Sequence, residues 1–198
     1  MKKLFALTML AAALALTGCG KGGGKKGSSQ DKEIKEEEFS QIASENLAKE
    51  NPYTTASMTA NKKQVVGATT THNLNGTASY ARDGGNWVLT ESNIDDQLQQ
   101  FHPESYINFT MDRYATFVTK FREMVGDFDK LAFTTGKTYK VVLEKGMFTF
   151  NGLDYNSVNA TIEWDEYGQL LLFDEKDSID YSGAQVTLTD NIQFTYSA

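Results

Sequence analysis

The chain has 198 residues, which is enough for one domain with a sizeable core. Its 26 acidic residues outnumber the 19 basic ones and give a formal charge of −7 at neutral pH. A nucleic-acid surface needs clustered Lys and Arg, so an acidic chain with few arginines excludes nucleic acid as an expected partner. The single cysteine cannot form a disulfide within the chain, so apolar packing must hold the core.

The first 18 residues have the order of charge and hydropathy that is typical of an export signal. Lys2 and Lys3 form a positive amino-terminal region, and residues 4–16 form an apolar run that is too short for a comfortable transmembrane span. The run ends in Leu16-Thr17-Gly18-Cys19, which resembles the lipobox of bacterial lipoproteins. The resemblance implies transfer of a diacylglyceryl group to the Cys19 sulfur and cleavage between Gly18 and Cys19. As is usual in that class, it also implies acylation of the new amino terminus with a fatty acid such as palmitate.

Two or three acyl chains would hold the mature protein durably on a membrane, because each buried methylene contributes about 0.8 kcal/mol and one chain binds only marginally. We therefore predict a lipid-anchored protein of the bacterial cell envelope, on the extracytoplasmic side of a membrane. Without residues 1–18 the chain keeps 17 basic against 26 acidic residues, a charge of −9, and anionic headgroups would repel it. The alternative is an ordinary secretory signal beside an incidental cysteine, which leaves the position of the only thiol unexplained.

A flexible tether is predicted for residues 19–30, which are Gly, Lys and Ser after the cysteine with almost no other residue type. Residues 31–198 are predicted to form a single globular domain. Apolar residues recur at helical spacing from Phe39 to Leu47, and acidic residues gather just before them, where the helix dipole favours negative charge. Asn51-Pro52 ends this predicted N-terminal helix.

A first block of strands and a helical insert follow. Residues 53–60, 64–71, 74–82 and 86–91 alternate like strands, with turn chemistry at Asn75-Gly76 and Asp83-Gly84-Gly85. Residues 93–128 are predicted to be helical, in a short piece closed before Pro103 and a longer amphipathic piece that Gly126 ends. The apolar stripe of the longer piece is wide enough to cover a sheet.

A second block of strands completes the chain, at residues 131–135, 138–144, 147–151, 157–165, 169–174, 178–181, 185–189 and 191–196. Short turns between them favour antiparallel pairing, and alternation such as Val158, Ala160 and Ile162 indicates one buried and one solvated face. The predicted fold class is α+β. We expect a curved antiparallel sheet, half-barrel-like, with the N-terminal helix and the central helical insert packed on one face.

This order of elements, a helix, a strand meander, a helical insert and a second meander, resembles the LolA and LppX class of envelope proteins. The resemblance implies a half-barrel that holds acyl chains between its concave face and the helices. Alternation places Leu170 and Leu172 on the same inner face. The possible apolar cleft would be lined by Trp87, Leu89, Phe121, Phe148, Phe150 and Trp164. The same side chains would also suit a closed core, and the sequence leaves both alternatives open.

Patterns for catalysis, metals and cofactors are missing from the sequence. His72 and His102 have no H-E-x-x-H or C-x-x-C motif near them, and Gly136-Lys137-Thr138 lacks the first glycine of a phosphate loop. Acidic residues at 163–166 and 174–180 are interpreted as solvated turns, because the Gly and Glu positions of an EF-hand loop are absent. We expect no enzyme activity, no metal and no cofactor.

The expected function is therefore that of a membrane-anchored envelope lipoprotein that binds an apolar or lipid-like ligand, or a protein partner. The alternative is a structural, interaction or sensor module with a closed core and no small-molecule ligand. Both expectations place the membrane contact at the lipid on Cys19.

Overall fold

The computed structural model describes residues 31–95 and 101–198. The predicted signal, with Gly18 and Cys19, and the predicted tether lie outside the described residues. The strands are β1 (Lys32–Ile34), β2 (Thr55–Val66), β3 (Thr69–Asp83), β4 (Asn86–Asp95), β5 (Lys130–Thr135), β6 (Tyr139–Lys145), β7 (Phe148–Phe150), β8 (Leu153–Trp164), β9 (Leu170–Tyr181) and β10 (Ala184–Ser197). The helices are α2 (Glu36–Leu47), α3 (Pro103–Ile107) and α4 (Met111–Val125).

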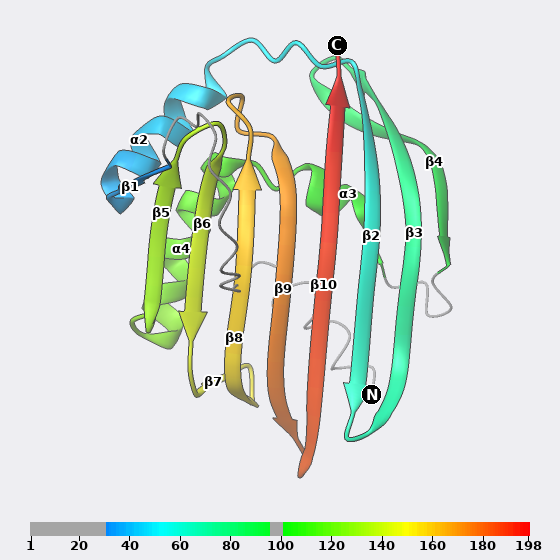
Figure 1. The fold of residues 1–198 in the computed structure, drawn as a ribbon, viewed down its shortest axis with the longest axis vertical. Helices are drawn as coiled ribbons and strands as arrows, with labels where there is room; N and C mark the ends of the chain where they lie inside the picture. The colour runs from blue at the N-terminus through cyan, green and yellow to red at the C-terminus, as the bar shows by residue number, and fades with distance from the viewer. Residues whose placement is uncertain (1–30, 96–100) are drawn as a thin grey trace, which may run out of the picture.

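All the strands belong to one 10-stranded antiparallel sheet in the order β1-β5-β6-β8-β9-β10-β2-β3-β4, with β7 paired to β8 beside this path (Figure 1). The last strand, β10, lies in the interior of the sheet and pairs with β9 on one side and β2 on the other. It thereby joins the meander before the helical insert to the meander after it. The sheet is open, with β1 and β4 as its edges, and the predicted α+β class is confirmed.

The helices lie on one face of the sheet (Figure 1). The amphipathic spacing of α4 explains its position, because Met111, Tyr114, Val118 and Phe121 are buried three or four residues apart. In α2 the buried residues Phe39, Ala43 and Asn46 follow the same spacing, and Phe39 packs on Phe133 of β5. The short α3 starts at Pro103, where a proline is tolerated because the first helical N–H has no partner.

The two faces of the sheet differ in chemistry, as β10 illustrates. Its inward residues Val186, Leu188, Ile192 and Phe194 are buried, and its outward residues are mostly Thr, Gln and Asn. The inner face carries two groups of buried apolar residues. The central cluster includes Phe39, Tyr114, Trp164 and Phe173 and packs under α2, α3 and the first half of α4. The β7-end cluster comprises Phe121, Leu143, Tyr155, Val158, Ala160, Ile179, Val186 and Leu188.

The strand boundaries differ from those expected from the sequence. The turn between β2 and β3 lies at Gly67, and the predicted turn at Asn75-Gly76 is wrong because both residues lie within β3. Gly76 is needed there for close approach rather than for a turn: a Cβ would lie 2.5 Å from the Asn93 carbonyl oxygen of β4. A register shift beside Trp164 places Leu172 opposite Glu163 and Gln193, so Leu172 does not share the inner face of Leu170.

Candidate functional site

Three of the six predicted cleft residues meet at the β7 end of the inner face. The Phe121 ring of α4 lies 5.9 Å from the Phe148 ring and 5.7 Å from the Phe150 ring, both edge-on. Phe148 also stacks on Tyr155 of β8 with 4.7 Å between the ring centroids. The short strand β7 therefore brings two aromatic rings under the carboxyl end of α4, and these contacts form the wall of the β7-end cluster.

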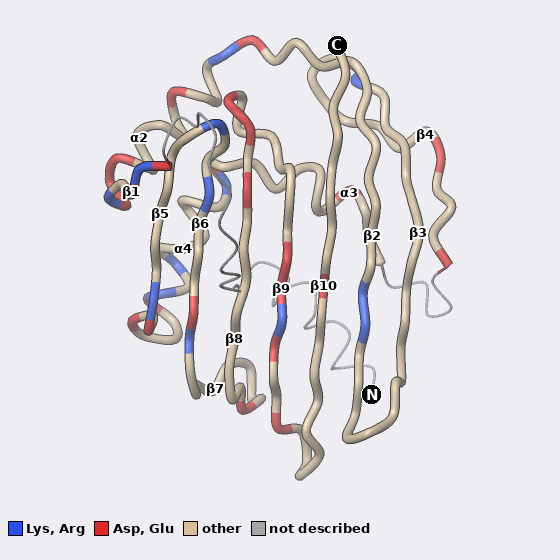
Figure 2. Tube along the Cα trace, in the orientation of Figure 1, with Lys and Arg blue, Asp and Glu red and all other residues tan. Residues whose placement is uncertain are grey.

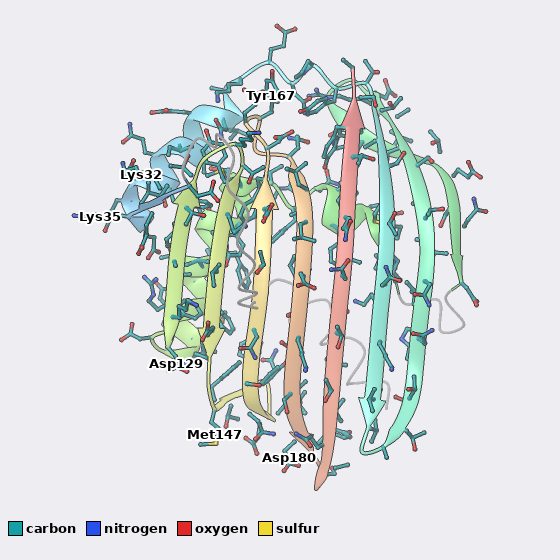
Figure 3. All side chains as sticks on the ribbon, in the orientation of Figure 1. Lys32, Lys35, Asp129, Met147, Tyr167 and Asp180 are labelled. Carbon is teal, nitrogen blue, oxygen red and sulfur yellow. The ribbon has the colours of Figure 1, made fainter. Side chains whose placement is uncertain are left out.

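The β7-end cluster reaches the surface of the molecule. Half-buried apolar residues surround its buried core, namely Val66, Phe117, Val125, Phe128, Leu131, Val142, Phe148, Phe150, Leu153 and Tyr181. Beside them, the side chains of Met124 and Met147 are 55% and 83% exposed. Figure 3 shows Met147 at the end of the molecule where β7 lies. Apolar side chains at this end are thus partly exposed to solvent, and flexible methionine side chains adapt readily to apolar partners.

The other three predicted cleft residues lie elsewhere. Trp164 has no exposed surface: its ring packs 5.1 Å from that of Tyr114, and its indole nitrogen donates to the Phe109 carbonyl oxygen at 3.0 Å. Trp87 and Leu89 are half-buried on the edge strand β4. The Trp87 indole nitrogen donates to Gln169 Oε1 at 3.1 Å. The structure therefore divides the six residues between the β7 end, the sealed central cluster and the β4 edge.

A buried charged group lies on the inner face where β9, β10 and β2 run side by side. Lys62 Nζ is 2.7 Å from Asp190 Oδ2 and donates to the Tyr106 hydroxyl at 3.1 Å. The Tyr106 hydroxyl in turn donates to Asp190 Oδ2 at 3.1 Å. The pairing register places Glu175 of β9 beside Asp190, so charged segments of the three strands lie at one height of the sheet (Figure 2).

Two further carboxyl groups extend this charged group toward the β7-end cluster. Glu175 and Asp177 are 4% and 1% exposed, which corrects the interpretation of residues 174–180 as a solvated turn. No N–H or hydroxyl group of the described residues donates to Glu175 Oε1 or to either carboxylate oxygen of Asp177, and the two carboxyl groups lie within hydrogen-bond reach of each other if one is protonated. Lys62 thus supplies one positive charge to a group of three buried carboxyls, those of Asp190, Glu175 and Asp177. Because burial of an unpaired charge is costly, the excess carboxyl groups should hold protons.

The pKa shifts of the group have the expected directions. Burial raises the pKa of Glu175 and of Asp177 well above their usual values, and the negative charge of Asp190 adds to both increases. Burial alone would lower the pKa of Lys62, but the charge and hydrogen bonds of Asp190 and Tyr106 together outweigh burial and raise that pKa. Lys62 therefore stays charged, while Glu175 and Asp177 bind protons more tightly than they would in water.

Stability should consequently fall as the pH rises. The unfolded chain releases the protons of Glu175 and Asp177 near pH 4, whereas the folded chain retains them to higher pH, so the free energy of unfolding decreases across that interval. The groups that face the two carboxyls are Asp190, Lys62, Tyr106, Tyr114 and Tyr155. In Glu175→Gln we expect the free energy of unfolding to decrease less with rising pH, as measured by urea unfolding between pH 4 and pH 9.

Glu123→Gln, at an exposed position of α4, serves as the control for this measurement. It should leave the pH dependence of the free energy of unfolding unchanged. A wild-type stability that rises steadily from pH 4 to pH 9, or equal pH profiles for wild type and Glu175→Gln, would contradict the assignment.

No group of three or more His, Cys, Asp or Glu in residues 31–95 and 101–198 could hold a metal ion. Within the same residues no helix is long and apolar enough to cross a membrane. The chain matches no protein-family model, and comparison with curated proteins finds no significant similarity.

Proposed function

We propose that this chain is a lipid-anchored protein of the bacterial cell envelope that binds an apolar or lipid-like ligand at the β7-end cluster and catalyses no reaction. The observation that carries the ligand proposal is the pair of half-buried rings, Phe148 and Phe150, that pack on buried Phe121 at the end of the molecule where Met147 is exposed. Exposed apolar surface that is continuous with a core is typical of ligand and interaction sites.

The central cluster limits where the ligand can bind. Phe39, Tyr114 and Trp164 have no exposed surface, and the Trp164 ring contacts the rings of the other two. This packing favours a closed interior under α2 and the first half of α4. The proposed ligand site is therefore confined to the β7 end, and an acyl chain would lie along the half-buried rings of Phe148 and Phe150, which cover Phe121.

The proposed anchor is compatible with contact between the β7 end and a bilayer. The residues from Cys19 to Gln30 span at most about 40 Å when fully extended. They lead to β1, which pairs with the end of β5 that is remote from β7, and the six residues of β5 are about 20 Å long. Because the tether is longer than this strand, the anchored domain can turn its β7 end toward the membrane.

Photocrosslinking in membranes tests the ligand site. The full chain in phosphatidylcholine vesicles is irradiated with a photoreactive palmitate analogue, and the labelled peptides are identified by mass spectrometry. We expect labelling of α4 and β7 that unlabelled palmitate competes away. Phe148→Ser should weaken this labelling about tenfold or more, because a buried Phe side chain contributes about 1.5–3 kcal/mol to apolar contact.

Val88→Ser is the matched control, since Val88 is an exposed apolar residue of the edge strand β4. It should not alter the labelling of α4 and β7. Labelling restricted to residues 1–30, or labelling that Phe148→Ser leaves unchanged in a folded protein, would instead favour an interaction module with a closed core.

A further inference from the structure

A pocket lies at the end of the sheet opposite the β7 end. Four segments meet there: the end of α2 with the loop after it (43–51), the β3–β4 hairpin (82–87), the α3–α4 junction (107–113) and the β8–β9 turn (167–169). Figure 3 shows Tyr167 at one end of the molecule and Met147 at the other. We call this site the amide-lined pocket. Its volume of about 240 Å³ lies below the usual 300–1,000 Å³ of drug-sized sites, so it suits a small ligand.

The amide-lined pocket concentrates positive charge in an acidic protein. Lys49, Arg82 and Arg113 line it together with a single acidic residue, Asp112, while the whole chain has a charge of −7. Each cation donates to a backbone carbonyl oxygen. The acceptors are Glu166 for Lys49 at 2.9 Å, Asn51 for Arg82 at 2.7 Å and Asn108 for Arg113 at 2.9 Å.

These hydrogen bonds orient the three cations without neutralising them. Within the described residues none of the three lies within ion-pair distance of a carboxylate. A carbonyl oxygen carries no net charge, and Lys and Arg have three and five N–H donors, of which one is used in each of these contacts. The pocket therefore retains donors and positive charge for an anionic group.

Neutral groups complete the lining. They include the amides Asn46, Asn51, Asn86, Asn108 and Gln169 and the rings of Trp87 and Tyr167, beside the apolar side chains of Ala43, Leu47, Ile107 and Met111. Asn46 is 2% exposed, and its Nδ2 donates to the Met111 sulfur at 3.7 Å, which is a weak acceptor. A nearly buried amide that donates only to a thioether is a polar group that a ligand oxygen would satisfy better.

Trp87 provides a fixed aromatic surface. Its indole nitrogen is held by Gln169 Oε1, and the Arg82 guanidinium lies 6.0 Å from its ring centroid. The turn that carries Gln169 is itself held, because Asp165 Oδ1 accepts the backbone N–H groups of Tyr167 and Gln169, each at 2.9 Å. The pocket wall is therefore built before any ligand binds, which reduces the entropy cost of binding.

The first turn of α4 adds to the positive electrostatic potential of the pocket. Met111 N donates to the Gly168 carbonyl oxygen at 3.1 Å, and the side chain of the N-cap residue Thr110 caps no N–H. The positive end of the helix dipole thus points into the same pocket and favours an anion, although Asp112 offsets part of it.

We propose that the amide-lined pocket binds a small organic anion whose carboxylate or phosphate group is held by Lys49, Arg82 and Arg113 and whose hydroxylated body stacks on Trp87. This site is separate from the apolar β7 end, and the proposal does not depend on the proposed apolar ligand. Ion pairs and charge-assisted hydrogen bonds supply the affinity for the anionic group, and the amides accept and donate to hydroxyl groups.

Matched sugars test the proposal on the full chain, solubilised in an amine-oxide detergent at constant ionic strength. Glucuronate and glucose 6-phosphate are the anionic probes, glucose is the neutral probe and glucosamine is the cationic one. Tryptophan fluorescence reports on binding, because Trp87 is half-exposed and the other tryptophan, Trp164, is fully buried. We expect at least one anion to bind saturably and about tenfold more tightly than glucose or glucosamine.

Charge-removing variants localise the binding. Lys49→Gln and Arg113→Gln should each weaken binding of that anion about threefold to tenfold, whereas Lys120→Gln, on an exposed position of α4, should not. The proposal is overturned if neither anion changes the fluorescence, if glucose binds as tightly as the anions, or if Lys120→Gln weakens binding as much as Lys49→Gln. These outcomes leave palmitate crosslinking at the β7 end unaffected.

Discussion

Lys62→Met is expected to reduce the free energy of unfolding by about 3–5 kcal/mol at pH 7, because removing one partner of a buried ion pair leaves the other uncompensated. Lys62 lies 2.7 Å from Asp190, and their side chains are only 14% and 8% exposed. Glu175 and Asp177 lie in the same group, so the variant loses the cation that faces three buried carboxyl groups. Urea unfolding followed by circular dichroism measures the change.

Two further variants separate the effect of breaking the buried ion pair on stability from the effect of replacing a lysine in general. Lys140→Met breaks the Lys140–Glu163 pair, whose side chains are 33% and 22% exposed, and should cost less than about 1 kcal/mol. Lys62→Met combined with Asp190→Leu should recover much of the stability, since both buried charges are then removed. If Lys62→Met and Lys140→Met reduced the free energy of unfolding equally, the buried ion pair would contribute no more to stability than the more exposed one, which would contradict the prediction.

Cys19→Ser is expected to abolish lipid attachment. If the sequence Leu16-Thr17-Gly18-Cys19 acts as a lipobox, the only sulfur that can accept a diacylglyceryl group is lost with Cys19. Cells grown with radiolabelled palmitate should label the wild-type chain and give essentially no label in the variant. Label that persists in Cys19→Ser, or a wild-type mature chain that starts at a residue other than 19, would contradict the proposed anchor.

The fold class was predictable because it depends on patterns that are local in the sequence. The periodic apolar residues of α2 and α4 and the Asp83-Gly84-Gly85 turn between β3 and β4 correspond to elements of the structure. Antiparallel order followed from the short turns between strands. The pairing of β10 with β2, by contrast, joins residues far apart in the chain and has no local signal.

Most misplaced strand ends have one common cause, which is the buried charged group. The sequence predicted strand breaks at residues 61–63, 175–177 and 190, where Lys62, Glu175, Asp177 and Asp190 interrupt the apolar alternation. In the structure β2, β9 and β10 continue through these positions, and the charged residues lie side by side across the sheet. Each charged residue alone suggests a turn in the sequence, and only the strand register shows that these residues face one another.

The candidate site at the β7 end was predictable in part, because local apolar patterns show which side chains face inward. Alternation identifies Phe148 and Phe150 as inward residues, and helical spacing does so for Phe121, so these three could be expected on one side of the sheet. The separation of Trp87 from them depends on the strand order, since β4 lies at the edge far from β7, whereas Trp164 lies at the opposite end of β8, the strand with which β7 pairs. The amide-lined pocket joins four distant segments and gives no motif in the sequence.

Native mass spectrometry of the full chain shows whether an apolar ligand occupies the β7 end. The chain is purified from bacterial membranes in mild detergent and its intact mass is compared with that of the denatured chain. We expect a native species that is heavier than the denatured, lipid-anchored chain by the mass of one lipid or fatty acid, and less of this species in Phe148→Ser. A native mass that equals the denatured mass, also after incubation with palmitate, would contradict it.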